Sequence, residues 1–204
     1  MHRFVSTSLL SLLAVNIGVI VFAVKDEWSP PTILATYWLQ SVIIGIFQAK
    51  KMSGLQKFRT DGLKINEQPV APVASTRRKV VRFFLFHYGL FHVVYLSFLF
   101  TYAGAPDFVG VLTAGAAFFA NHLFSYYENH ERDLRHVPNI GGMMFFPYIR
   151  IIPMHLFVVL GAIVIPTTAG LVFFLTLKTL ADAAMHMIEH YGDTNTLRSS
   201  GRFY

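Results

Sequence analysis

The chain has 204 residues, of which 54% are hydrophobic and 14% are charged. Soluble domains carry about 25% charged residues, so this composition excludes an ordinary soluble protein and indicates a single integral membrane domain over residues 1–204. The net charge of +6 does not indicate nucleic acid, because the basic residues flank apolar segments, as in proteins that face anionic lipid.

Two apolar segments begin the chain, and each is long enough to cross a bilayer as a helix. The first covers about 5–24 and is predicted as an uncleaved span, with signal-peptide cleavage after Ala23 as the alternative. Trp28 and Pro30 then indicate a turn at the membrane interface. The second predicted span follows at about 32–49.

The next segment, 50–79, is polar and rich in lysine and arginine. An excess of these residues predicts a loop on the cytoplasmic side of the membrane. Within it, residues 55–63 either lie on anionic headgroups or belong to a solvated loop. The basic residues are Lys50, Lys51, Lys57, Arg59, Lys64, Arg77, Arg78 and Lys79.

Four more spans are predicted beyond this loop. A polar connection separates the second and third of them, and Pro147 closes it. If the basic loop is cytoplasmic, alternating spans put both termini in the cytoplasm as well. The sequence therefore predicts an all-α, polytopic membrane bundle of about six helices, N-in and C-in, in a prokaryotic cytoplasmic membrane. The four spans are about 81–102, 108–127, 148–165 and 169–191.

The last span carries a stripe of ionisable residues. They recur every four positions and so lie along one face of a helix. Such groups are costly inside a bilayer unless they meet a partner or a wet cavity, and they therefore indicate function. Lys178 either neutralises Asp182 or helps to bind an anionic group. The stripe consists of Lys178, Asp182, His186 and His190.

Histidine is abundant for so apolar a chain, with nine residues, whereas cysteine is absent and thiolate ligands are excluded. Counted at about 1.5 Å per residue from the predicted cytoplasmic boundary, four spans each bring one histidine roughly 8–10 Å into the membrane. His92 lies deeper, and His87 and His92 can both face inward only with a wide cavity or a bulge near Gly89. The four histidines are His87, His122, His155 and His186.

Imidazoles gathered in a helix bundle beside a carboxylate favour a transition-metal site. We expect zinc first, iron or copper as alternatives, and haem after them. The competing interpretation is that each histidine is bonded separately to a carbonyl or a tyrosine. The predicted ligands are His87, His92, His122, His155 and His186; the proton is carried by Asp182 or Glu189; the substrate is held by Asn129, Arg150 or Lys178; and Ser125, Tyr88 and His190 support the ligands.

Several of these residues belong to longer motifs in the last four spans. The motifs are His87-Tyr88-Gly89-Leu90-Phe91 with His92, Asn121-His122 with Ser125-Tyr126 and Asn129, Phe146-Pro147-Tyr148 with Arg150-Ile151 and Met154-His155, and Lys178 with Asp182 and His186. On these motifs the chain from about Val81 to His190 resembles a bacterial and archaeal family of multi-pass membrane proteins that is known only as a domain of unknown function. The resemblance implies the same polar positions and no particular activity. A more distant likeness, through His186 and His190, is to the seven-span zinc hydrolases that cleave lipid amides.

The predicted function is that of a metal-containing membrane protein, and the predicted activity is hydrolysis or oxidation of a lipid or another hydrophobic substrate. One alternative is a non-catalytic membrane subunit or a haem- or metal-handling protein. Another is a proton or ion pathway through Lys178, Asp182 and His186. Membrane lipids are the expected partners, together with a second copy of the chain or a larger membrane complex, and nucleic acid is not expected.

Overall fold

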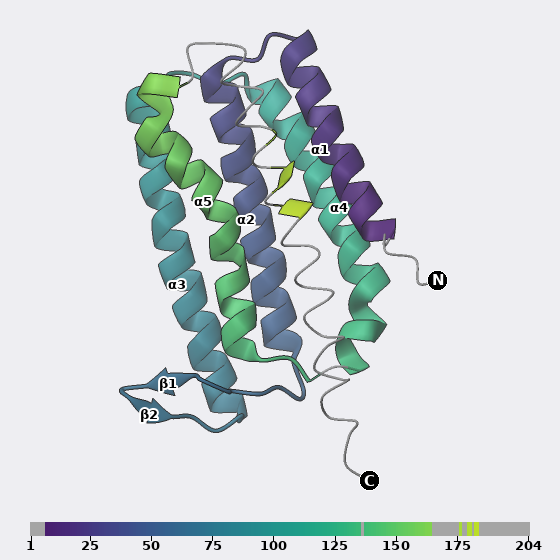
Figure 1. The fold of residues 1–204 in the computed structure, drawn as a ribbon, viewed down its shortest axis with the longest axis vertical. Coiled ribbons are helices and arrows are strands. Elements are labelled where there is room, and N and C mark those ends of the chain that lie inside the picture. Colours follow the sequence, from purple (N-terminus) through teal and green to yellow (C-terminus); the bar gives the residue numbers. More distant parts are fainter. Residues whose placement is uncertain (1–6, 136, 165–175, 177–178, 181, 184–204) are drawn as a thin grey trace.

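The computed structural model describes residues 7–135, 137–164, 176, 179–180 and 182–183. Within these residues the chain forms five α-helices packed side by side, with one small hairpin at an end of the bundle (Figure 1). The elements are α1 (Thr7–Lys25), α2 (Pro30–Gly54), β1 (Lys64–Ile65), β2 (Gln68–Pro69), α3 (Ala74–Phe98), the π-helical segment η1 (Leu99–Ala103), α4 (Phe108–Arg135) and α5 (Ile140–Val164).

Three helices of the described chain are long and apolar enough to cross a membrane. They are Pro30–Gly54, Ala74–Thr101 and Phe108–Glu128. Large apolar side chains such as Phe86 and Leu112 are exposed on the outer faces of α3 and α4, which is typical of a surface that lipid covers. The prediction of an all-α fold with membrane-like helices is confirmed.

α2 is the central helix, with α3 and α5 on one side and α4 and α1 on the other (Figure 1). In the most apolar stretch of α2, 78% of the residues are buried, whereas the share is 28% in the corresponding stretches of α3 and α4. α2 therefore contributes the most to the core. Two glycines allow neighbouring helices to approach it closely. A methyl group on Gly45 would overlap the Tyr88 ring of α3, and one on Gly115 of α4 would overlap Leu39.

Neighbouring helices in the chain run in opposite directions. Trp38 of α2 donates to the carbonyl of His92, and Ser41, further along α2, pairs with Tyr88, which precedes His92 in α3. α2 and α3 are therefore antiparallel. The starts of α2 and α4 are hydrogen-bonded to each other, from the Asp107 backbone N–H to the Thr32 side chain, which is consistent with these two helices being parallel.

The basic loop is packed against one end of the bundle. β1 and β2 form its hairpin, and the segment before them pairs with the connection that leads into α5 (Figure 1). Arg59 N–H donates to the Pro138 carbonyl over 2.8 Å, and Ile140 N–H donates to the Arg59 carbonyl over 3.0 Å. Phe58 is buried in the same hydrophobic cluster as Ile140. Residues 55–63 therefore include a packed cap, which neither predicted alternative for this segment described.

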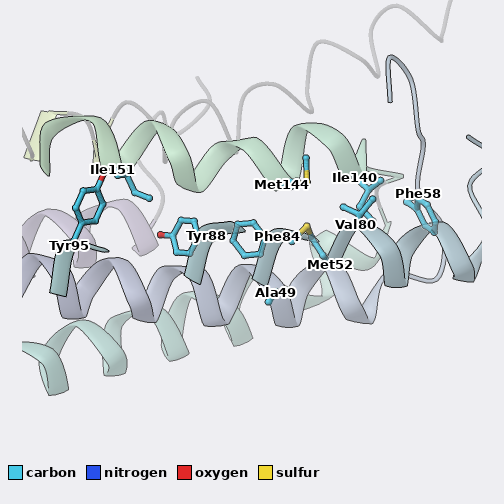
Figure 2. Close-up of a cluster of buried hydrophobic side chains, with 10 residues drawn as sticks. All are labelled: Ala49, Met52, Phe58, Val80, Phe84, Tyr88, Tyr95, Ile140, Met144 and Ile151. Carbon is cyan, nitrogen blue, oxygen red and sulfur yellow. The ribbon is translucent and has the colours of Figure 1, made fainter. Parts of the chain in front are cut away.

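A row of aromatic side chains from α3 fills the core between α2 and α5. Figure 2 shows Phe84, Tyr88 and Tyr95 in this row. Met52 of α2 and Ile140 of α5, both with 0% of their surface exposed, close the cluster near the hairpin. The row brings polar ring atoms of two tyrosines into an otherwise apolar interior.

Three helices extend at least seven residues beyond the predicted spans. α3 begins at Ala74, in the segment predicted as loop, and α4 continues to Arg135 through the predicted polar connection. α5 begins at Ile140, well before the predicted start of the fifth span. Asn139 stabilises this start, because its Oδ1 accepts from Gly141 N–H over 2.9 Å.

Candidate functional site

A polar strip on α2 faces a carboxylate from the last part of the chain. Tyr37, Gln40 and Ser41 are spaced as neighbours on one helix face, and all three are buried. Asp182 is buried too, with 4% of its surface exposed. Gln40 Nε2 lies 3.5 Å from Asp182 Oδ2, and the carboxylate also acts electrostatically on the Tyr37 hydroxyl. The predicted proton-carrying Asp182 therefore lies inside the bundle against α2.

Ser41 joins this strip to α3. Tyr88 Oη donates to the Ser41 backbone carbonyl over 2.9 Å and also lies 2.9 Å from Ser41 Oγ. A phenol has only one proton to donate, so the Ser41 hydroxyl is the donor in the second bond. Tyr88, which was predicted to support metal ligands, thus holds α2 and α3 in register.

His92 presents a bare nitrogen inside the bundle. Its Nδ1 lies 2.8 Å from the Tyr88 carbonyl, and since a carbonyl only accepts, Nδ1 carries the proton and Nε2 the lone pair. Nε2 is buried, and no residue in the described part of the chain gives it a hydrogen bond. The rings of Trp38, Tyr88 and Tyr95 surround it. Metal-binding imidazoles are commonly held in this way.

The two histidines between α3 and α5 are bonded to tyrosines. His87 Nδ1 lies 2.9 Å from Tyr148 Oη, and Tyr95 Oη lies 2.9 Å from His155 Nδ1. The order of these pairs makes α3 and α5 parallel, so His155 is level with Tyr95, about 12 Å along the helix from His87. The prediction that His87 and His155 share one depth is wrong, because Tyr148, and not His155, is level with His87.

His122 lies on the opposite side of α2. Its ring stacks on Phe47, with centroids 6.1 Å apart, and the neighbouring Asn121 accepts a hydrogen bond from Ser11 of α1. Asn121 is buried, and Ser125 is partly buried one turn later. His122 therefore packs against α2 away from the interface of α3 and α5, where His87 and His155 lie.

These histidines do not gather around a common point. Among residues 7–135, 137–164 and the few described beyond them, no three histidine, aspartate or glutamate side chains could hold a metal ion. α3 is regular across Gly89, so His87 and His92 reach α5 and α2 without a bulge. The predicted ligand His186 lies outside the described residues, as do Lys178, Glu189 and His190, and the side chains of Asn129 and Arg150 are not described either. The four-histidine site stays a prediction.

The α2 side of the site was missed in the reading of the sequence. Tyr37, Gln40 and Ser41 are polar residues in an apolar span, at the same helical spacing that drew attention to the last span. This spacing was the available signal. Tyr148, the partner of His87, carried no comparable signal, because tyrosine is common at membrane interfaces.

Comparison with known proteins identifies a family and no function. No curated protein and no solved structure matches the chain, so nothing there supports the likeness to zinc hydrolases that cleave lipid amides. The sequence model of one family of unknown function matches residues 2–198, a wider range than the last four spans that carried the resemblance. The chain therefore belongs to this family of unknown function, DUF6498.

Proposed function

We propose that this chain is a membrane protein that moves protons along a polar path beside α2, with Asp182 as the central carrier. The observation that carries the proposal is the burial of Asp182 against Gln40. An ionised carboxylate at the centre of a membrane helix costs about 3 kcal/mol, so its presence favours a function that needs it.

The chemistry required is reversible protonation of one carboxylate. Gln40 Nε2 lies within hydrogen-bond distance of the Asp182 carboxyl group, and Tyr37 lies beside it, so two polar groups of α2 flank the atom that would take up and release the proton. In the sequence, Lys178 stands four residues before Asp182 and His186 stands four residues after it. An imidazole exchanges protons readily near neutral pH. Together these groups would pass a proton along the membrane-embedded part of the chain.

The proposal includes an orientation in the membrane. The described helices alternate in direction, and a sixth span that contains Asp182 continues this alternation. Because the hairpin end of the bundle is basic, we assign it to the cytoplasm of a prokaryotic cell, with both termini on the same side.

The test is proton flux into liposomes that contain the purified protein and a pH-sensitive dye, driven by a potassium diffusion potential. Wild-type protein should acidify the lumen, and Asp182→Asn should reduce the rate at least tenfold. Asp26→Asn is the matched control, since Asp26 is exposed in the turn after α1. A wild-type rate equal to that of empty liposomes, or equal rates in Asp182→Asn and wild type, would reject the proposal.

A second candidate is the metal-containing membrane protein, with hydrolysis or oxidation of a lipid as its activity. The observation that favours it is the buried Nε2 of His92, to which no residue in the described part of the chain is hydrogen-bonded and whose tautomer suits coordination of zinc, iron or copper. The predicted ligand His186 would have to join His92 from the last span.

Elemental analysis of purified protein tests this second candidate. If the chain is a metal-containing protein, the measurement should find close to one metal ion per chain in wild type and less than a tenth of that in His92→Gln. His155→Gln is the comparison, because His155 is exposed and bonded to Tyr95, and it should retain the metal. Metal-free wild-type protein, or equal loss in both variants, would reject a site centred on His92.

A further inference from the structure

The outer face of α3 changes from basic to apolar along its length. Arg78, Lys79 and Arg82 are exposed near the hairpin end. The apolar residues Phe86 and Leu90 continue the same face, with 73% and 51% of their surfaces exposed. The buried residues of α3 lie on the opposite face, toward α2 and α5.

The three basic side chains of this face are not used within the protein. Arg78, Lys79 and Arg82 make no side-chain hydrogen bond or ion pair with the residues that the structure describes. Other basic residues nearby are engaged: Arg59 pairs with Asp61, and Arg77 donates to the Leu55 carbonyl.

The surroundings of this face are also strongly basic. Residues 50–82 contain nine lysines and arginines and only two carboxylates, Asp61 and Glu67. The packed cap formed by Phe58 and the Arg59 backbone holds this charge at one end of the bundle. A fixed excess of positive charge beside an apolar surface matches a ligand with an anionic head and an apolar tail.

We propose that the outer face of α3 binds an anionic phospholipid, whose phosphate lies between Arg78 and Arg82 and whose acyl chains lie along Phe86 and Leu90. Arginine forms bidentate bonds to phosphate oxygens, and the two arginines are one turn apart on the same face. The inference rests on the membrane placement proposed above and not on proton movement. It can therefore hold even if the flux experiment fails.

The experiment measures lipid binding to detergent-purified, delipidated full-length protein by native mass spectrometry, with phosphatidylglycerol and phosphatidylcholine as probes. Wild-type protein should retain phosphatidylglycerol in preference to phosphatidylcholine. Arg78→Gln/Arg82→Gln should bind phosphatidylglycerol at least about tenfold more weakly, since each charge near an anionic lipid surface is worth about fivefold. The control Lys57→Gln/Lys64→Gln removes the same charge from exposed positions of the loop and should bind as wild type does.

Four results would overturn the proposal. The first is equal binding in wild type and the arginine variant, and the second is an equal loss in the control, which would indicate unspecific attraction. The third is a loss of self-association in the arginine variant without a loss of lipid binding, which would assign the face to a second copy of the chain. Glycerol phosphate is added as a separate probe, and binding as tight as that of the lipid would assign the site to a soluble phosphate instead.

Discussion

Gln48 of α2 donates a hydrogen bond of 2.7 Å from its Nε2 to the backbone carbonyl of Met143 in α5. In a regular helix that carbonyl would accept from the residue four positions later, which is Pro147 and has no N–H. Gln48 therefore supplies the bond that the proline removes. This explains how α5 continues through Pro147 inside an apolar bundle, where an unbonded carbonyl would be costly.

Gln48→Leu should destabilise the protein by about 1–2 kcal/mol, because the Met143 carbonyl loses its side-chain donor inside an apolar bundle. Unfolding by sodium dodecyl sulfate, followed by circular dichroism, measures the change. Pro147→Ala should restore an N–H to that carbonyl, so the double variant should recover most of the loss. Additive effects of the two substitutions would show that Gln48 and Pro147 are not coupled.

This pair shows where prediction of the fold succeeded and where it failed. The apolar runs identified the helices and their order, because span length and hydropathy are local properties of the sequence. The start of α5 was placed too late, since Pro147 normally ends a helix. The hydrogen bond that Pro147 removes is replaced by Gln48, which is 95 positions from Met143 in the sequence. No rule based on neighbouring residues can find such a donor. The expected depth of His155 was wrong as well, because the helix starts are not level and His87 pairs with Tyr148.

Gly45→Ala should destabilise the protein by about 1–3 kcal/mol, because the added Cβ would lie 2.4 Å from Tyr88 Cε1 in a packed interface. Gly89→Ala is the matched control. It has no heavy atom within 4 Å of its added Cβ, and alanine favours a helix by about 1 kcal/mol, so the protein should become slightly more stable. The same unfolding assay measures both. Equal stability of the two variants would contradict the close contact of α2 and α3.

Cross-linking should establish the register of α3 and α5, and the absence of native cysteine makes it straightforward. Tyr95→Cys/His155→Cys should link efficiently with a short bifunctional maleimide, which bridges the space that the two rings, with centroids 6.1 Å apart, occupy in the native protein. His87→Cys/His155→Cys should not link, as the positions are about 12 Å apart along the helices. Efficient linking of the second pair would contradict this register and support the common depth of His87 and His155 that was predicted from the sequence.

The site was predictable on one side only. Asp182 was identified because an ionisable residue in an apolar span is conspicuous on its own. Gln40 was overlooked because an uncharged amide in a span has many harmless explanations, and its meaning appears only when the fold puts it beside a carboxylate. The histidines were over-interpreted for a related reason: their number was informative, but the tyrosines that bind His87 and His155 come from a neighbouring helix.

Gln40→Leu should slow proton flux about tenfold or more without abolishing it. The amide lies 3.5 Å from Asp182 Oδ2 and holds the carboxyl group against α2, so its loss removes a polar group from the proposed proton path. Gln56→Leu is the control, as Gln56 is exposed in the loop after α2. The liposome assay described for Asp182→Asn measures all three variants. If Gln40→Leu conducts as wild type does while Asp182→Asn does not, the carboxylate carries protons without help from α2, and the contact between Gln40 and Asp182 serves packing alone.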